Sequence, residues 1–195
     1  MVPSLCCCCC CCCCCCCCLL LLQIYPARYI EQENYFQMSM TDGVGRSYRY
    51  YEGEPLWPFG WGLTLTDWSL TLDRSPASGA SVRDSAAALG GGGLGNFSVK
   101  LKNVGQHDSD EVVFVYFSPQ FKRPDCPVPK RQLIDFRRVH VAKGGQAVLT
   151  FSVSSEQLHL VNADGTRSAR IGHYALEFTN GVNATATVDV NVRER

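Results

Sequence analysis

Residues 111–118 read EVVFVYFS, an almost unbroken run of β-branched and aromatic side chains. Such a run is too short for a buried helix and is typical of a central strand that is covered on both faces. In other parts of the chain, apolar residues alternate with polar ones with a period of two. These segments are residues 67–73, 97–101, 133–141, 148–153, 174–178 and 184–192. Together the patterns predict about seven short strands.

Glycine-containing turns separate several of the predicted strands. They lie at residues 103–105 (NVG), 143–145 (KGG) and 180–181 (NG). No segment has a sustained helical period, apart from one possible turn at residues 155–160. Short alternating strands separated by such turns predict an all-β fold, an immunoglobulin-like β-sandwich over residues 66–195. Tyr174 opens the penultimate strand, where a tyrosine suits a tyrosine corner whose hydroxyl bonds a nearby backbone group.

Residues 74–95 interrupt this pattern with serine, alanine and glycine, and Gly90 to Gly93 form a glycine tract. Flexible linkers have this composition, so we expect a mobile loop here.

The N-terminal residues 1–23 have very low complexity. All but one of the 14 cysteines form a single run, residues 6–18, and four leucines follow it. Adjacent cysteines cannot pair as a spaced disulfide framework does, and the run has no zinc-ligand spacing. Three interpretations remain: a signal-like segment, a membrane span of about minimal length, or a disordered segment that reflects an artefact of the gene model. We favour the last and do not expect membrane association.

The net charge and the lack of metal-ligand spacing among the cysteines and histidines argue against nucleic-acid binding and against metal or cofactor sites. The chain has 18 basic and 18 acidic residues, and this balance gives no indication of a nucleic-acid partner. Cys126 is isolated and the four histidines are scattered, so we expect no metal site and no cofactor. A local basic patch surrounds a proline-rich loop, which we expect to be solvated, although an anionic polysaccharide or a partner domain is an alternative. Its members are Lys122, Arg123, Lys130, Arg131, Arg137 and Arg138.

Residues 24–65 contain many aromatic side chains but little periodicity. Because proline and glycine break helices, we expect an extended, irregular linker rather than a helix. Leaving so many aromatic rings exposed to water is unfavourable. We therefore expect them to pack on the sheet, to pack on another domain or to stack on sugar. The candidates for these contacts are Tyr48, Tyr50, Tyr51, Trp57, Phe59 and Trp61.

Two parts of this linker carry a recognisable signature. Residues 45–51 read GRSYRYY and residues 58–66 read PFGWGLTLT. They resemble the "GRTYRFY … YPFGYGLSYT" signature of the fibronectin type III-like domain at the C-terminus of glycoside hydrolase family 3 enzymes, of the β-xylosidase and β-glucosidase type. The likeness continues in order through residues 97–105, 129–139 and 172–174. The tyrosine of "LSYT" is replaced by Leu65, and the glycine tract resembles an insertion.

This resemblance implies a non-catalytic accessory domain. In the family, the nucleophile and the acid/base lie on domains that precede the matched region, and the enzymes are secreted and degrade xylan or β-glucan. The resemblance therefore predicts no catalytic residue, no activity of this chain alone, and the catalytic domains of a parent β-glycosidase as partners. Two alternatives stay open: a stand-alone carbohydrate-binding module, and a C-terminal fragment of an O-glycosyl hydrolase whose catalytic exons are missing.

Three other motifs suggest sites. Thr66-Asp67-Trp68 resembles the Ser-Asp-Trp around the family's nucleophile, but a retaining glycosidase needs a second carboxyl group in a sugar-sized pocket, so we predict that Asp67 is not catalytic. Residues 107–111 (HDSDE) are rich in oxygen ligands but lack the spacing of a calcium loop. The tripeptides at Asn96 and Asn183 are N-glycosylation sequons.

Overall fold

The computed structural model describes residues 24–34, 36–62, 64–76, 81–84, 93–123 and 126–194. The predictions for residues 1–23 and for most of the glycine tract lie outside this part of the chain. Among the described residues, no helix is long and apolar enough to cross a membrane.

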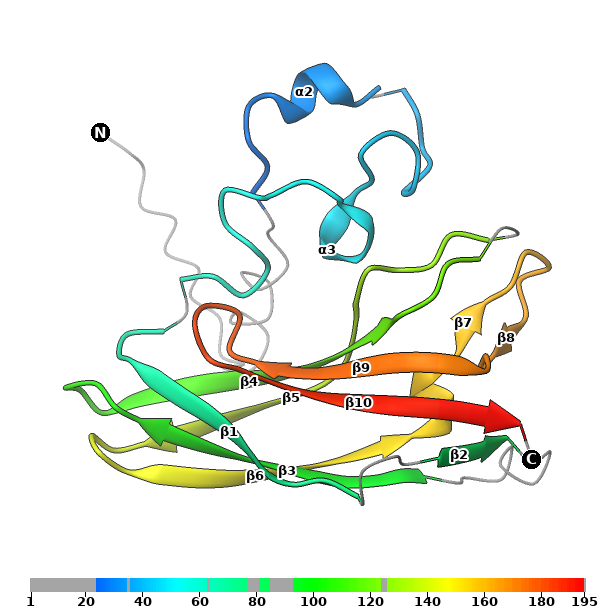
Figure 1. The fold of residues 1–195 in the computed structure, drawn as a ribbon. Coiled ribbons are helices and arrows are strands. Elements are labelled where there is room, and N and C mark those ends of the chain that lie inside the picture. Colours follow the sequence, from blue (N-terminus) through cyan, green and yellow to red (C-terminus); the bar gives the residue numbers. More distant parts are fainter. Residues whose placement is uncertain are drawn as a thin grey trace, which may run out of the picture.

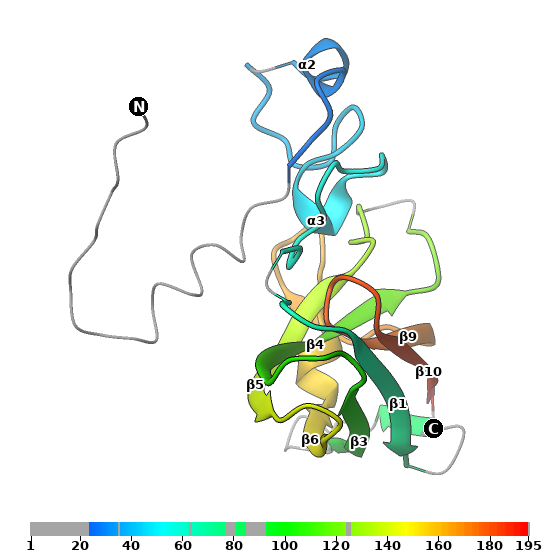
Figure 2. The same cartoon turned by 90° about the vertical axis from the view of Figure 1, so that its left-hand side faces the viewer.

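The described strands form a β-sandwich (Figures 1 and 2). The strands are β1 (Trp68–Arg74), β2 (Ser81–Asp84), β3 (Gly93–Asn103), β4 (Ser109–Pro119), β5 (Gln132–Val141), β6 (Gln146–Ser154), β7 (Leu160–Val161), β8 (Arg167–Ser168), β9 (Gly172–Thr179) and β10 (Thr185–Glu194). One sheet has the order β1-β3-β6, the other has the order β2-β10-β9-β4-β5, and β7 pairs with β8. All predicted strands are present, and the all-β sandwich is confirmed.

The pairing is antiparallel except at one edge, where β2 runs parallel to β10. The chain therefore passes from the first sheet, where β1 pairs with β3, to the second sheet, where β2 pairs with β10. The prediction of a loop without strands over residues 74–95 was wrong at this point, because β2 and the start of β3 lie within it. The sequence of β2 has no alternating pattern of its own, and its pairing with β10 is non-local.

The main hydrophobic core lies between the two sheets. Val113, Val115 and Phe117 of β4 point into it, and Phe97 and Phe178 meet there with ring centroids 6.0 Å apart. Trp68 is buried in the same core, as expected of a core aromatic. Phe114 and Tyr116, the intervening residues of β4, are also fully buried, but they belong to a second cluster on the outer face of the sheet. The unbroken run of residues 111–118 is therefore covered on both faces, as predicted.

A tyrosine corner joins the second sheet to the preceding loop. The hydroxyl of Tyr174 donates to the carbonyl oxygen of Arg170 at 2.8 Å and accepts from the amide of the same residue at 3.2 Å. This confirms the predicted role of Tyr174. A 3-10 helix, η2 (Ser155–Leu158), forms the predicted turn after β6.

Residues 24–65 are not uniformly extended. They contain two helical turns, α2 (Tyr29–Gln32) and α3 (Ser47–Tyr50), so the prediction that no helix forms in this segment was wrong. A helical turn can form at residues 47–50 because they contain neither proline nor glycine. The proline and glycines of the PFGWG motif come only later, from residue 58 onward.

Candidate functional site

The described residues between 24 and 65, here called the arm, lie over the outer face of the sheet that contains β4 and β9 (Figures 1 and 2). Three tyrosine rings hold the outer part of the arm together. Tyr25 stacks on Tyr29 with ring centroids 4.2 Å apart, and both rings meet Tyr51 edge-on at 4.9 and 5.5 Å. Aromatic pairs in these geometries stabilise beyond their buried area. The arm is thus a small packed structure rather than an unstructured linker.

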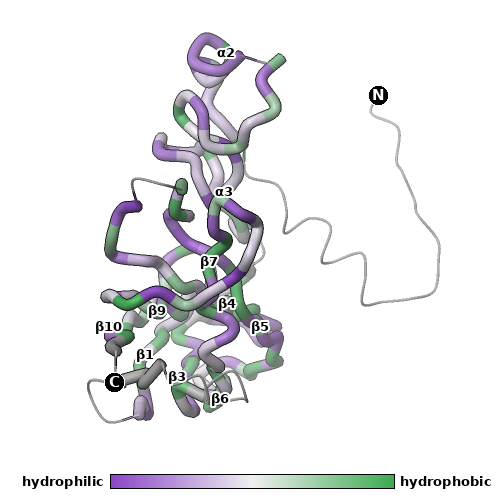
Figure 3. The backbone as a smooth tube through the Cα atoms, turned by 90° about the vertical axis from the view of Figure 1, so that its right-hand side faces the viewer, coloured by the Kyte–Doolittle hydropathy of each residue, from purple (hydrophilic) through white to green (hydrophobic). Residues whose placement is uncertain are grey.

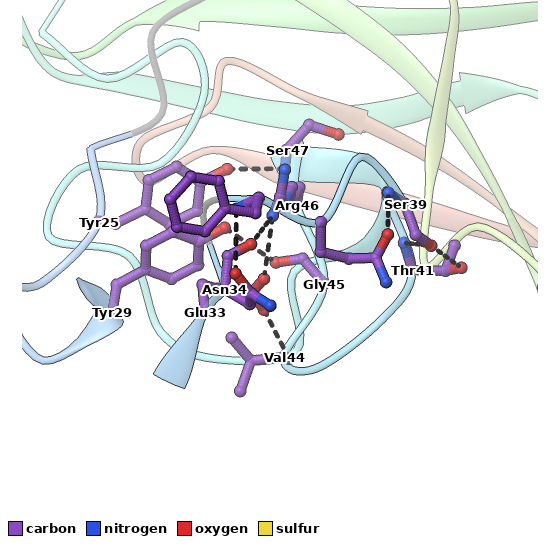
Figure 4. Close-up of polar contacts among 12 residues, drawn as sticks. Tyr25, Tyr29, Glu33, Asn34, Ser39, Thr41, Val44, Gly45, Arg46 and Ser47 are labelled. Carbon is purple, nitrogen blue, oxygen red and sulfur yellow. Dashed lines mark hydrogen bonds and ion pairs between the residues drawn. The ribbon is translucent and has the colours of Figure 1, made fainter. Parts of the chain in front are cut away.

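A buried carboxylate organises the loop between α2 and α3 (Figure 4). Glu33 Oε1 accepts the amide of Val44 at 2.9 Å, and Oε2 forms an ion pair with Arg46 Nη2 at 3.5 Å. Arg46 also donates to the carbonyl oxygen of Asn34 at 2.9 Å. Gly43 has a φ of +65°, and a Cβ there would lie 2.6 Å from Glu33 Oε1. This loop therefore requires both the carboxylate and the glycine.

The start of α3 has a strained backbone. Ser47 has a φ of +59°, which is uncommon outside glycine. The hydroxyl of Tyr25 accepts the amide of Ser47 at 2.6 Å, as Figure 4 shows. Burial raises the pKa of the Tyr25 hydroxyl above its ordinary value, although the Ser47 amide opposes this shift. This hydrogen bond stabilises the turn that orients α3.

A second hydrophobic cluster joins the arm to the outer face of β4. Phe59 is 3% exposed, and its ring lies 5.8 Å from Phe114 and 4.8 Å from Tyr48. Tyr48 in turn meets Tyr116 at 5.8 Å. Gly60 has a φ of +90°, and a Cβ there would lie 2.9 Å from the Phe114 ring. Phe59 and Gly60 of the PFG segment therefore provide the contact that packs the arm on the outer face of β4.

Polar contacts extend this junction to the β4–β5 connection and β5. Leu133 donates its amide to the Tyr48 hydroxyl at 3.3 Å, and Arg49 Nη2 donates to Gln132 Oε1 at 2.7 Å. The amide of Lys130 donates to the carbonyl oxygen of Arg49 at 2.6 Å. These contacts join residues more than 80 positions apart, and no local pattern in the sequence indicates them.

The six predicted contact aromatics thus separate into two groups. Tyr51 and Phe59 are buried and Tyr48 and Tyr50 are partly buried, whereas Trp57 and Trp61 are 46% and 50% exposed. Along the arm, positions of hydrophobic residues lie among positions of hydrophilic ones (Figure 3). The other large hydrophobic residues exposed on the arm are Ile24, Ile30, Phe36, Met38, Met40, Leu56 and Leu65.

The other candidate sites have structural explanations. Asp67 is exposed, and its carbonyl oxygen accepts the amides of Val104 and Gly105 at a turn. Asp108 accepts the amide of Lys143, and Asp110 pairs with Arg138 at 2.8 Å, so these carboxylates of the HDSDE segment already have partners.

Among the described residues, no group of three or more histidine, cysteine, aspartate or glutamate side chains could hold a metal ion. The Cys126 thiol donates to the carbonyl oxygen of Val161 at 3.4 Å. Both sequon asparagines, Asn96 on β3 and Asn183 in the β9–β10 turn, are exposed.

The predicted basic patch is divided by the fold. Lys122, Arg123 and Lys130 line a cavity of 490 Å³ between the arm and the β4–β5 connection. Arg131 forms an ion pair with Glu177 at 3.7 Å, and its guanidinium lies 4.7 Å from the centroid of the Tyr116 ring. Arg137 and Arg138 lie further along β5 and do not line this cavity.

Comparison with known proteins identifies the sandwich. Residues 111–181 match the family described as "Fibronectin type III-like domain". Strands β4 to β9 of the sandwich belong to this family. The chain is 31% identical to a probable exo-1,4-beta-xylosidase of Aspergillus japonicus and 29% identical to Beta-D-xylosidase 3 of Arabidopsis thaliana, over 85% and 78% of its length. These alignments span 22% of each relative, so the chain spans about a fifth of the length of these enzymes.

Solved structures agree with this fold. A GH3 exo-beta-xylosidase in complex with a xylobiose aziridine probe superposes with a TM-score of 0.72 and 24% identity, over 88% of this chain and 23% of that enzyme. A beta-glucosidase from Listeria innocua in complex with isofagomine superposes with a TM-score of 0.60 and 20% identity, over 82% of this chain and 21% of the enzyme. The resemblance to the fibronectin type III-like domain of glycoside hydrolase family 3 is confirmed.

Proposed function

We propose that this chain is a non-catalytic accessory module that packs against the catalytic domains of a glycoside hydrolase family 3 β-glycosidase. The observation that carries the proposal is the exposed apolar surface of the arm. Phe36 is 95% exposed and Met38 is 85% exposed, and several large apolar side chains exposed on one segment indicate an interaction site. The second cluster and the Arg49–Gln132 hydrogen bond fix the arm on the sandwich. The exposed apolar side chains therefore belong to a folded part of the molecule.

The size of the relatives supports the same partner. The chain matches about a fifth of each xylosidase, so most of each relative lies outside the matched segment and could supply the surface against which the arm packs. Burying the arm against such a domain would contribute roughly 25 cal/mol for each Å² of apolar surface removed from water. The role is therefore structural: the module stabilises the catalytic domains and does not act on sugar itself.

Co-purification tests the proposal. The Aspergillus japonicus relative, with its matching segment deleted, would be co-expressed with the full-length chain. We expect a complex that melts at a higher temperature than the truncated enzyme alone. The double variant Phe36→Ser/Met38→Ser should weaken the complex at least tenfold, whereas Phe136→Ser/Val148→Ser, which removes two half-exposed apolar side chains from the sandwich, should leave it intact. Equal effects of the two pairs would refute a docking role of the arm.

Hydrolysis of aryl β-xyloside and aryl β-glucoside tests the absence of catalysis. We expect no turnover by the purified chain, since a retaining glycosidase needs two carboxyl groups about 5–5.5 Å apart. Turnover that disappears in Asp67→Asn would overturn this expectation.

A second candidate function rests on Trp57 and Trp61, which are half-exposed and could stack on sugar rings. Under this alternative the full-length chain is retained on insoluble xylan, and retention is lost in Trp57→Ala/Trp61→Ala. Under the accessory-module proposal the chain passes through the xylan column without delay.

A further inference from the structure

A groove separates the arm from the connection between β4 and β5. It consists of two cavities of 490 and 420 Å³ that share Gln120 and Lys130 as lining residues. Figure 1 shows α3 beside this connection, which rises from the end of β4. Each cavity lies in the range of about 300–1,000 Å³ that is typical of small-ligand sites. The accessory role proposed above does not use this groove, since neither Phe36 nor Met38 lines it.

Among the lining residues that the structure describes, basic side chains outnumber acidic ones. Lys122, Arg123 and Lys130 line the first cavity, where Glu52 is the one acidic residue among the described lining residues. Arg123 donates to the carbonyl oxygen of Val161 at 3.2 Å, so its position is fixed. The side chains of Lys122 and Lys130 are exposed and form no ion pair with any described residue. Two ammonium groups are thus available to an anion.

The second cavity adds no net charge. Arg131 and Glu177 both line it, and they neutralise each other in their ion pair at 3.7 Å. Its remaining polar groups are neutral or shared with the first cavity, and Tyr48 and Tyr51 form part of its wall. This cavity therefore offers aromatic surface and hydrogen-bonding groups next to the cationic one.

Aromatic rings also line the cationic cavity from both sides. Tyr50 comes from the arm, and Phe121 comes from the connection after β4. The Phe121 ring is held edge-on to Tyr174 at 5.3 Å, and Gly172 leaves room for it, because a Cβ there would lie 2.8 Å from the ring. The side-chain amide of Gln120 adds an acceptor, Oε1, while its Nε2 donates to the carbonyl oxygen of Ser118 at 3.1 Å. Aromatic faces with a few polar groups suit a sugar ring with its hydroxyls, whereas a bare cationic patch would suit any anion.

We propose that this groove binds a carboxylate-bearing saccharide, such as a chain of uronic acids. The ammonium groups of Lys122 and Lys130 meet its carboxylates, and Tyr50 and Phe121 pack against the faces of its sugar rings. The arm and the sandwich both contribute to the site, so the site exists only when the arm is folded onto the sandwich.

Affinity electrophoresis of the full-length chain tests the proposal, with polygalacturonate as the acidic saccharide, xylan as the neutral one and poly-L-glutamate as an anion without sugar rings. We expect polygalacturonate to retard the chain most strongly, with a retardation that weakens as salt screens the charges. Lys122→Gln/Lys130→Gln should weaken this binding at least tenfold. The matched control Lys102→Gln/Lys143→Gln removes the same charge from exposed positions outside the groove and should bind as the unaltered chain does.

Tyr50→Ala separates a saccharide site from a general anion site. We expect this variant to lose affinity for polygalacturonate at least fivefold without a change in its binding to poly-L-glutamate. The proposal is overturned if polygalacturonate does not retard the chain, if the control pair weakens binding as much as the groove pair, or if poly-L-glutamate binds as tightly as polygalacturonate. Circular dichroism of each variant establishes that the sandwich is intact, and all four lysines are exposed, so the charge variants should fold.

Discussion

The hydroxyl of Tyr48 accepts the backbone amide of Leu133 across 3.3 Å, which joins the arm directly to β5. The same tyrosine packs its ring against Phe59 and Tyr116, so one side chain takes part in both the polar and the apolar contacts of the junction. The position of the arm, and with it both proposed surfaces, depends on this junction.

Tyr48→Phe should therefore lower the free energy of unfolding by about 1 kcal/mol, because the Leu133 amide loses its partner while the ring contacts remain. Tyr48→Ala should cost roughly 2 kcal/mol more, since it also removes the ring from the second cluster. Urea denaturation followed by tryptophan fluorescence measures both values. Tyr50→Phe is the control, because the Tyr50 hydroxyl has no hydrogen-bond partner among the described residues. A loss of similar size in that variant would contradict the role assigned to the Tyr48 hydroxyl.

Two glycines of the PFGWG motif allow a second test of the junction. Gly60 and Gly62 both have positive φ, +90° and +85°, but only at Gly60 would a Cβ meet a neighbour, the buried ring of Phe114 at 2.9 Å. Both alanine variants should lose about 1 kcal/mol from backbone strain. Gly60→Ala should lose roughly 2 kcal/mol more, because the tightly packed Phe114 cannot move away. Thermal and urea unfolding of the two variants side by side gives this difference, and equal losses would show that the contact is absent.

The sequence predicts the sandwich well because its signal is local. Most of the long strands carry their own period of two, whereas residues 111–118 of β4 show by their lack of alternation that a second layer covers them. The sequence does not show that Phe59 and Tyr48 provide this layer, since nothing in residues 111–118 specifies which distant segment packs there. The short strand β2 was missed for the same reason, because its pairing with β10 is a tertiary contact.

The candidate site was predictable only in part. The PFGWGL motif identified the aromatic residues, but their separation into buried Phe59 and half-exposed Trp57 and Trp61 follows from the path of the arm. Similarly, the basic residues of one loop were visible in the sequence, whereas the convergence of Lys122 and Lys130 with Tyr50 requires the folded arm.

Asn103 provides a test of the sandwich itself. Its side chain is fully buried, with Nδ2 donating to the carbonyl oxygens of His107 and Val141 at 2.7 and 3.1 Å, and Oδ1 accepting the amide of Gly105 at 3.1 Å. Asn103→Asp places a carboxylate oxygen against the two carbonyls, so we expect a loss of roughly 3 kcal/mol at neutral pH. Part of this loss should be recovered in acid, where the new carboxyl group is protonated. Asn96→Asp, at an exposed position of the same strand, should change stability little.

The buried Glu111 makes the stability of the sandwich depend on pH. Burial raises the pKa of its carboxyl group above the ordinary 4.5, and this desolvation outweighs Thr64 and the Val112 amide, which favour the charged form. Its Oε2 has no hydrogen-bond partner of good geometry among the described residues. Since the folded state binds the proton more tightly than the unfolded state, the stability from Glu111 is complete below pH 4.5 and decreases as pH rises through the folded-state pKa.

Glu111→Gln keeps the shape of the side chain but does not titrate. Its stability relative to the unaltered chain should therefore be lowest in acid and should increase as the pH rises above 4.5, as urea denaturation at a series of pH values would show. Asp110→Asn is the control of opposite sign, because the hydrogen bond from His140 and the Arg138 guanidinium lower the pKa of Asp110, so its contribution is present at neutral pH and is lost in acid. A constant difference between Glu111→Gln and the unaltered chain at all pH values would mean that Glu111 titrates as it does in water, and that its environment is solvated.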